Sequence, residues 1–464
     1  MSNVFYRKLG HALPKIVRAK GVYLYDEHGK RYLDACGGAM VTSIGHGVEQ
    51  IAEAMATQAK KVAYVNGTAF TNEPVEALAA ALAAKAPPGV DLAYFLCSGS
   101  EAVEASLKLA RQYHVERGDS ARTHIIARTP GYHGNTLLAL SASARPHYKA
   151  VYAPWLLDVA MIDAPYPYRA GPLGEAAPAM TGEALEQAIQ RIGAERVAAF
   201  IAEPIGGSST GASVPPPGHY ARIREICDRY GVLFIADEVL TGAGRTGKFF
   251  ALEHFKDRMG QPIAPDIITL GKGLNGGYAP LSALIAKRTI VQTLERGKFG
   301  GLVHAQTYSH HPVAAAAALA VLGYIEQHQL VERAASTGLA LLKAIRSGLS
   351  GPGASSIVGD VRGIGMLAAV ELVADVKTKR PFPRSAKLAE TLVATAREQG
   401  LVLWPNVGHA DGVNGDLVLI APPLTISNEE TGELVGLLGA AVEATVAALP
   451  RNAREDTHER THAG

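Results

Sequence analysis

The sequence predicts an α/β protein whose main sheet is mostly parallel. Two observations lead to this prediction. Short apolar stretches, each long enough for a strand, alternate with longer helical stretches. Each apolar stretch also ends in a cluster of Gly, Ser, Asp, Glu or Lys. The expected strands are 93–97, 124–128, 197–202, 232–236 and 267–270.

The residues before the first of these strands predict an extended lead-in and two helices. The stretches 21–26 and 29–34 indicate a β-hairpin. Alanine-rich stretches at 48–63 and 73–86 predict helices, and Pro-Pro-Gly at 87–89 ends the second. After the first sheet strand, 101–117 predicts another helix.

The rest of the chain predicts a loop and then a second domain. The Pro-, Gly- and Ala-rich stretch 164–182 indicates a loop, and 451–464 is a polar tail that we expect to be disordered. A chain of 464 residues is long enough for two or three domains. The other expected elements are helices at 312–329, 330–348, 386–400 and 428–448, a hairpin or strand pair at 358–372 and a strand at 417–421.

Composition excludes several classes of protein. Lys and Arg number 45 against 43 Asp and Glu, and without a long basic run this balance indicates no nucleic-acid partner. The three cysteines have no metal or redox spacing, which fits a reducing compartment, and we expect no metal site. The charged N-terminus does not resemble a signal peptide, and the apolar run 312–325 is too short to cross a membrane. We therefore expect a soluble, cytoplasmic protein without a membrane partner.

The polar residues at the strand ends predict one site. In open α/β sheets the carboxyl ends of the strands form the ligand crevice. Five such ends would bring together 98–100, 132–133, Glu203, Asp237 and Lys272. A purely structural sheet does not need an acid, a base and an aromatic ring at one edge.

Each of these residues has a chemical and a structural interpretation. Lys272 between two glycines is either a solvated loop lysine or a lysine that forms an imine with a carbonyl cofactor. Asp237 suits a heterocyclic nitrogen that must stay protonated, or it caps a helix or forms a salt bridge. Glu203 is a supporting acid or a turn residue. Ser98 or Ser100 binds a phosphate at a helix start or is only an N-cap, and Tyr132 stacks on a flat ring or packs structurally.

The glycine-rich stretch 242–248 imitates two nucleotide motifs. It fits G-x-G-x-x-G and the start of a P-loop, but Phe249 stands where a P-loop has its metal-binding hydroxyl. A dinucleotide fold would place its fingerprint in the first βα unit, which this stretch is not. A P-loop-like nucleotide hydrolase therefore remains a distant alternative.

Taken together, the motifs resemble those of the class III aminotransferases, pyridoxal-phosphate enzymes of fold type I that include ω-transaminases. The resemblance runs from about 34–46 to 422–424, and no single motif would be specific. In order, the motifs are Ser-Gly-Ser-Glu-Ala (98–102), Gly-Tyr-His-Gly (131–134), Ala-Glu-Pro-Ile (202–205), Ala-Asp-Glu-Val-x-Thr-Gly-x-Gly-Arg-Thr-Gly (236–247), Pro-Asp-Ile-Ile-Thr-Leu-Gly-Lys-Gly (265–273) and Ala-Pro-Pro-Leu (421–424).

The resemblance implies a large domain at 63–329 with a mostly parallel sheet of the seven-stranded type. It also implies a smaller α/β domain built from both chain ends, with 1–62 joining 330–450. The implied cofactor is pyridoxal 5'-phosphate, and the implied assembly is a homodimer, or a tetramer of two dimers, with its active sites at the interface. The implied substrates are a small-molecule amine and a keto acid.

The resemblance also implies roles for individual residues. Lys272 would carry the internal aldimine and then move a proton between carbon atoms, while Asp237 would pair with the pyridinium nitrogen. Tyr132 and Val239 would cover the two faces of the ring. Gly99 and Ser100, next to Ser98, would bind the phosphate of the cofactor. Glu203 would be an acid beside the cofactor, and His133 would lie beside Tyr132 in the cofactor site. Thr307 would contact the phosphate bound by the partner subunit.

The departures from the family pattern concern the substrate. Leu240 stands where several members have glutamine, and Leu419 where members acting on α-amino acids or 2-oxoglutarate often have arginine. The stretch 400–424 contains no Arg or Lys, although guanidinium groups are preferred for carboxylate recognition. We therefore expect an ω-amino acid or amine donor, with pyruvate favoured as acceptor. An aminomutase, racemase or decarboxylase on the same cofactor, or an inactive homologue, is the alternative.

Overall fold

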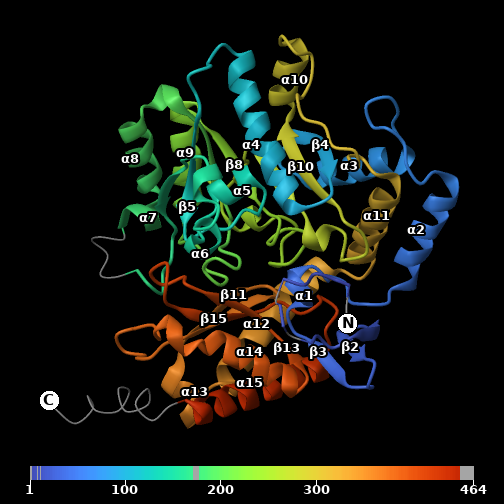
Figure 1. Ribbon diagram of the computed structural model, residues 1–464. Helices are drawn as coiled ribbons and strands as arrows, with labels where there is room; N and C mark the ends of the chain where they lie inside the picture. The colour runs from blue at the N-terminus through green and yellow to red at the C-terminus, as the bar shows by residue number, and fades with distance from the viewer. Residues whose placement is uncertain (1–2, 8, 11, 171–176, 450–464) are drawn as a thin grey trace.

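The structure is a computed structural model that describes residues 3–7, 9–10, 12–170 and 177–449. The tail predicted at 451–464 lies outside the described residues. Figure 1 shows a large α/β part and, below it, a smaller part in which the first strands of the chain lie beside its last third. The two chain ends therefore meet in the smaller part, as predicted. The domain boundaries themselves stay predictions.

A seven-stranded sheet forms the centre of the large part. Its order is β4-β10-β9-β8-β7-β5-β6, and only β10 runs antiparallel to its neighbours, which confirms the mostly parallel sheet. Two strands were not predicted from the sequence: β6, which has four residues, and β10, half of which is alanine and serine of low strand propensity. The strands are β4 (Val90–Leu96), β5 (His124–Thr129), β6 (Ala160–Asp163), β7 (Val197–Ala202), β8 (Leu233–Asp237), β9 (Ile267–Leu270) and β10 (Ser282–Lys287).

Helices cover both faces of this sheet (Figure 1). Along β7, Phe200 packs toward α8 and α9, whereas Ile201 packs toward α4 on the other face. Strands covered on both sides are apolar throughout rather than alternating in polarity, which is why they could be recognised in the sequence. The helices are α4 (Gly99–Glu116), α8 (Glu183–Ile192) and α9 (His219–Tyr230).

The remaining helices of the large part lie around the sheet. The loop predicted at 164–182 is partly wrong, because α7 lies within it and packs against α8. A short loop joins α5 to α6. These helices are α2 (Glu49–Lys61), α3 (Glu73–Lys85), α5 (Leu137–Ala142), α6 (Pro146–Lys149), α7 (Ala177–Thr181), α10 (Arg288–Arg296) and α11 (Pro312–Gln327).

The small part contains two four-stranded sheets. The predicted hairpin is confirmed, since β2 pairs antiparallel with β3, and β13 from the distant end of the chain pairs parallel with β3. The first sheet has the order β1 (Ile16–Lys20), β2 (Tyr23–Asp26), β3 (Arg31–Asp34), β13 (Leu401–Val402), and the second β11 (Val358–Ile364), β12 (Leu367–Leu372), β15 (Asp416–Ile420), β14 (Trp404–Val407). Its helices are α12 (Leu330–Gly348), α13 (Pro352–Ile357), α14 (Leu388–Glu398) and α15 (Asn428–Ala448).

By length and composition alone, α15 could cross a membrane. In this structure it packs against α12, α13 and α14, and its residues Leu434, Leu438 and Val442 are fully buried in the core of the small part. Core helices of globular proteins pass the same test. The hydrophobicity of α15 is therefore explained by packing.

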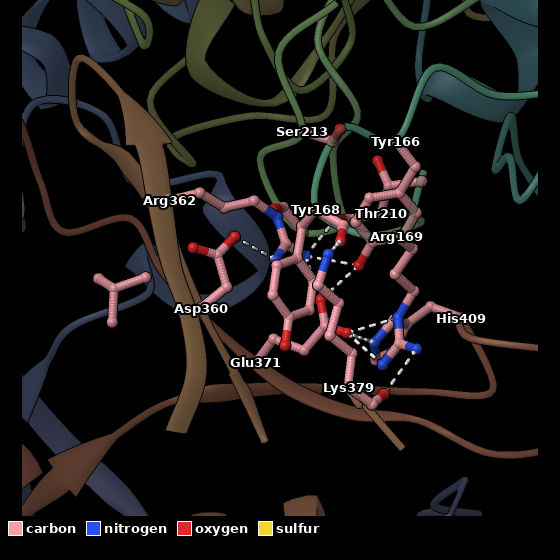
Figure 2. A network of polar contacts seen from close by, with 12 residues as sticks. Tyr166, Tyr168, Arg169, Thr210, Ser213, Asp360, Arg362, Glu371, Lys379 and His409 are labelled. Carbon is pink, nitrogen blue, oxygen red and sulfur yellow. Dashed lines mark hydrogen bonds and ion pairs between the residues drawn. The ribbon is translucent and has the colours of Figure 1, made fainter. Parts of the chain in front are cut away.

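A polar network joins the two parts of the molecule (Figure 2). At its centre is Glu371 on β12, which is 0% exposed and pairs with Arg169, from the loop after β6, and with Arg362 on β11. His409 lies 3.1 Å from the same carboxylate. Burial opposes ionisation of Glu371, but the contact with His409 and the charges of Arg362 and Arg169 hold its pKa well below the ordinary range. Glu371 is therefore ionised at neutral pH.

We expect Glu371→Ala to lower the free energy of unfolding by about 3–5 kcal/mol, because it leaves two guanidinium groups without their buried anion. Urea denaturation at pH 7 measures this loss. Because the folded-state pKa is depressed, the contribution is present above the unfolded pKa of about 4.3 and is lost as the pH falls through the folded value. The exposed pair between Lys15 and Glu27 is the control, and Glu27→Ala should change stability by less than about 1 kcal/mol.

Candidate active site

The carboxyl ends of the parallel strands surround a cavity of about 150 Å³. Eight of the ten predicted site residues line it, whereas Ser98 and Thr307 do not. Gly134, Ser208 and Thr241 also line it and were not predicted as site residues. The lining residues are Gly99, Ser100, Tyr132, His133, Gly134, Glu203, Ser208, Asp237, Val239, Leu240, Thr241 and Lys272.

Gly271 alone separates Lys272 from the end of β9, and Lys272 begins a short 3-10 turn, Lys272–Leu274. Its φ of +44° lies in the left-handed region, which a lysine rarely adopts and which usually marks a turn or a functional site. Burial lowers the pKa of its amine, and the negative charges of Asp237 and Glu203 partly oppose this effect. The solvated-loop interpretation does not fit this environment.

Asp237 ends β8 and is held by three hydrogen bonds. His133 Nδ1 lies 2.6 Å from its Oδ2, and its Oδ1 accepts from the Thr269 hydroxyl at 3.0 Å and from the Val239 amide at 3.2 Å. Thr269 reaches it because β8 and β9 are parallel neighbours in which Asp237 is paired with Thr269. A carboxylate oxygen pair accepts about four hydrogen bonds, so capacity remains for a group inside the cavity.

The N-terminus of α4 presents free amides to the cavity. Ser98 is the N-cap, and its hydroxyl accepts from the Glu101 amide at 3.3 Å while Glu101 accepts from the Ser98 amide. The N-cap interpretation of Ser98 is therefore correct for its side chain, and any part in phosphate binding stays a prediction. The amides of Gly99 and Ser100 have no acceptor among the described residues, and a helix start with free amides binds anions.

Two glycines keep this corner of the cavity open. A Cβ at Gly99 would lie 2.6 Å from Val239 Cγ1. A Cβ at Gly134, whose φ is +139°, would lie 2.5 Å from Ser100 Oγ. A larger residue at either position would displace the walls around the free amides. The two glycines therefore let backbone atoms approach whatever anion binds there.

Tyr132 and Glu203 form another part of the wall. The ring of Tyr132 lies under the guanidinium of Arg145, 5.5 Å from its central carbon. Glu203 follows β7 and accepts a hydrogen bond from the Ser209 hydroxyl, and burial raises its pKa. Glu203 is therefore an acid of the cavity rather than a turn residue alone.

Thr307 lies on the surface of the chain. It is exposed, and its carbonyl accepts a hydrogen bond from Tyr64 Oη at 2.9 Å. A residue that serves a partner subunit would have such a position, but this role stays a prediction. Among the residues that the structure describes, no group of three or more His, Cys, Asp or Glu is arranged for a metal ion.

The glycine-rich stretch 242–247 is a buried turn. Arg245 in this stretch donates to the carbonyls of Met366, at 3.1 Å, and Pro422, at 2.6 Å, and so attaches the turn to the small part. The next helical segment begins only at Ala251. The P-loop-like pattern is therefore explained by a turn that Arg245 attaches to the small part.

Comparison with known proteins identifies the family. The family model for class III aminotransferases matches residues 5–442. The uncharacterized aminotransferase YodT of Bacillus subtilis is 40% identical over 97% of this chain and 98% of its own length. The putrescine–pyruvate aminotransferase of Pseudomonas aeruginosa is 34% identical, over 96% and 94%. An amine transaminase from an uncultivated Pseudomonas species, solved in its PLP-bound form, superposes with a TM-score of 0.84 at 32% identity, covering 96% and 99% of the two chains.

Proposed function

The chain belongs to the class III aminotransferases, which depend on pyridoxal 5'-phosphate, and from this premise we propose its reaction. It moves an amino group from an ω-amino acid or an amine donor to a keto acid, with pyruvate preferred to 2-oxoglutarate. The observation that carries the proposal is that Lys272, Asp237 and the N-terminus of α4 line one cavity.

The residues of the cavity fit the coenzyme. Its phosphate suits the free amides of Gly99 and Ser100, in a corner that a Cβ at Gly99 or Gly134 would crowd. Its aldehyde needs a primary amine with a lowered pKa, which Lys272 provides. Its ring nitrogen needs a fixed anion, which Asp237 provides. When bound, the coenzyme supplies an aldehyde that exchanges amines and a ring that withdraws electrons from the reacting carbon.

The protein contributes position and proton transfer. Tyr132 and Val239 line the cavity where they would confine the faces of the ring, and Asp237 would hold a proton on the ring nitrogen because an opposite charge stabilises the charged form. His133 and Thr269 keep the Asp237 carboxylate oriented. The amine of Lys272 removes a proton from the amine-bearing carbon of the donor and returns one to the acceptor carbon.

The reaction proceeds by a ping-pong sequence. The donor enters and leaves as a carbonyl product before the keto acid enters and leaves as an amino acid. One amine, Lys272, serves both half-reactions, so both substrates use the same cavity. Glu203 lines this cavity as the supporting acid, and its carboxyl group accepts a hydrogen bond from the Ser209 hydroxyl.

The preference for pyruvate rests on the composition of the substrate side. Leu240 lines the cavity, and Leu419 is fully buried on β15, so neither position supplies a cation. No Arg or Lys lies between 400 and 424 to receive the second carboxylate of 2-oxoglutarate. The 34% identical putrescine–pyruvate aminotransferase supports an amine donor with this acceptor.

A donor panel tests the proposal. The purified holoenzyme should convert ω-amino acids, diamines or simple amines with pyruvate, and turnover with 2-oxoglutarate should be slower. The coenzyme band should shift when a donor is added without an acceptor. No transfer to either keto acid, together with carbon dioxide release, donor racemisation or a shifted amino group, would assign a decarboxylase, racemase or mutase instead.

We also propose that the active unit is a homodimer in the cytoplasm. Thr307 is exposed in a segment with the exposed apolar side chains Val303 and Tyr308, which fits a surface covered by a partner subunit. Light scattering should give the mass of a dimer or a tetramer. Activity that survives in a stable monomer would contradict this assembly.

A further inference from the structure

Three arginines in the described part of the chain are buried and form no ion pair: Arg128, Arg145 and Arg245. A buried cation without an anion loses its hydration without full compensation, so each of them needs an explanation. For two of these arginines, the surrounding residues supply the explanation. The third lies beside the substrate cavity.

Arg128 and Arg245 are explained by structural contacts. The guanidinium of Arg128 lies 5.4 Å from the ring of Phe200 and 5.3 Å from that of Tyr220, which are favourable cation–π distances. Arg245 joins the 242–247 turn to two carbonyl groups of the small part. Both arginines therefore stabilise packing.

Arg145 has a different set of partners. It lies between α5 and α6, is 9% exposed, and donates to Asn406 Oδ1 on β14 and to Ser208 Oγ at 3.0 Å. Its Nε has no partner. Both partners are neutral, and burial lowers the pKa of its guanidinium. Glu203 interacts with this cation electrostatically, but no carboxylate among the described residues forms an ion pair with it.

The position of Arg145 connects it to the reaction cavity. Ser208, which accepts its hydrogen bond, and Tyr132, over which it lies, both line the cavity. Because the Ser208 oxygen accepts from Arg145, the hydroxyl proton is free to be donated, and no acceptor for it occurs among the described residues. The Ser208 hydroxyl can donate a hydrogen bond into the cavity, and the Arg145 cation lies behind it. Such a site is suited to binding an anion.

We propose that Ser208 and Arg145 recognise the carboxylate of the keto acid acceptor, with Ser208 donating a hydrogen bond to it and Arg145 supplying the positive charge. This inference rests on the proposed function and names the substrate group that the site takes. It also explains how a chain without an Arg or Lys at 400–424 binds an acid. Asn406 fixes the guanidinium, since its amide also donates to the Ser209 carbonyl at 3.3 Å.

The test compares an acceptor that has a carboxylate with one that lacks it. We expect Ser208→Ala and Arg145→Gln to lower the ratio of kcat/KM for pyruvate to kcat/KM for propanal by about 10- to 100-fold, since each removes a hydrogen bond or charge that only pyruvate uses. The loss should be in KM rather than kcat. The inhibition constant of propionate, measured competitively against propanal, should rise by the same factor.

Arg245→Gln is the matched control, because it removes a buried, unpaired guanidinium of structural role. It should keep the wild-type ratio of the two acceptors even where it lowers stability. If Arg145→Gln does not fold, Ser208→Ala carries the test alone. An unchanged acceptor ratio and propionate constant in a folded Ser208 or Arg145 variant overturns this inference, whereas a wild-type holoenzyme that aminates neither acceptor overturns the proposed function.

Discussion

Lys272→Ala should abolish multiple turnover while the fold survives. The variant lacks both the amine that bonds to the coenzyme and the base that moves the proton. A positioned acid–base group alone contributes up to about 10⁴-fold. Initial rates with an amine donor and pyruvate measure the loss, and circular dichroism checks the fold. Borohydride reduction of the wild-type holoenzyme should attach the coenzyme to the peptide that contains Lys272.

The control for this substitution is Lys248→Ala. Lys248 is exposed and occupies the lysine position of the P-loop-like stretch 242–248. A nucleotide hydrolase would need this lysine, whereas the aminotransferase should lose little activity without it. Sustained turnover by Lys272→Ala, or borohydride labelling at another lysine, would remove Lys272 from the mechanism.

Asp237→Asn should lower kcat/KM by about 10- to 1000-fold, because a nearby opposite charge shifts a pKa by about 1–3 units. The substitution keeps the size of the side chain but removes the charge that holds the proton on the ring nitrogen. The absorbance of the bound coenzyme should change with the charge of its ring. A rate close to that of the wild type would place Asp237 outside the reaction.

A graded comparison separates the charge of Asp237 from its orientation. Thr269→Val removes one hydrogen bond to Oδ1 and leaves the charge in place. Its effect on kcat/KM should be smaller than that of Asp237→Asn, because the charge and two of its three hydrogen bonds remain, and we expect about 10-fold, the lower end of the range for one hydrogen bond to a charged group. Equal losses in both variants would mean that orientation, and not charge, is the contribution of Asp237.

Much of the large sheet could be predicted from the sequence. Strands β7 and β8 are apolar up to a charged residue, which is Glu203 just after β7 and Asp237 at the end of β8, so both the strands and their polar edge could be predicted. The antiparallel strand β10 was not, because Ser-Ala-Leu-Ile-Ala-Lys has little strand propensity and is held by pairing with β4 and β9. The pairing of β13 with β3 joins residues almost 370 positions apart and has no local signal.

The sequence by itself determined the chemistry: an apolar strand followed by a glycine-flanked lysine, another followed by Asp237, and a helix start between them. Strand period and residue type are local properties, so they survive without a fold. Only the tertiary structure decided which groups act together. In the folded chain His133 contacts Asp237, Ser98 caps α4, and Arg145 donates a hydrogen bond to Ser208 beside the cavity. Each of these contacts depends on chain packing and not on spacing along the sequence.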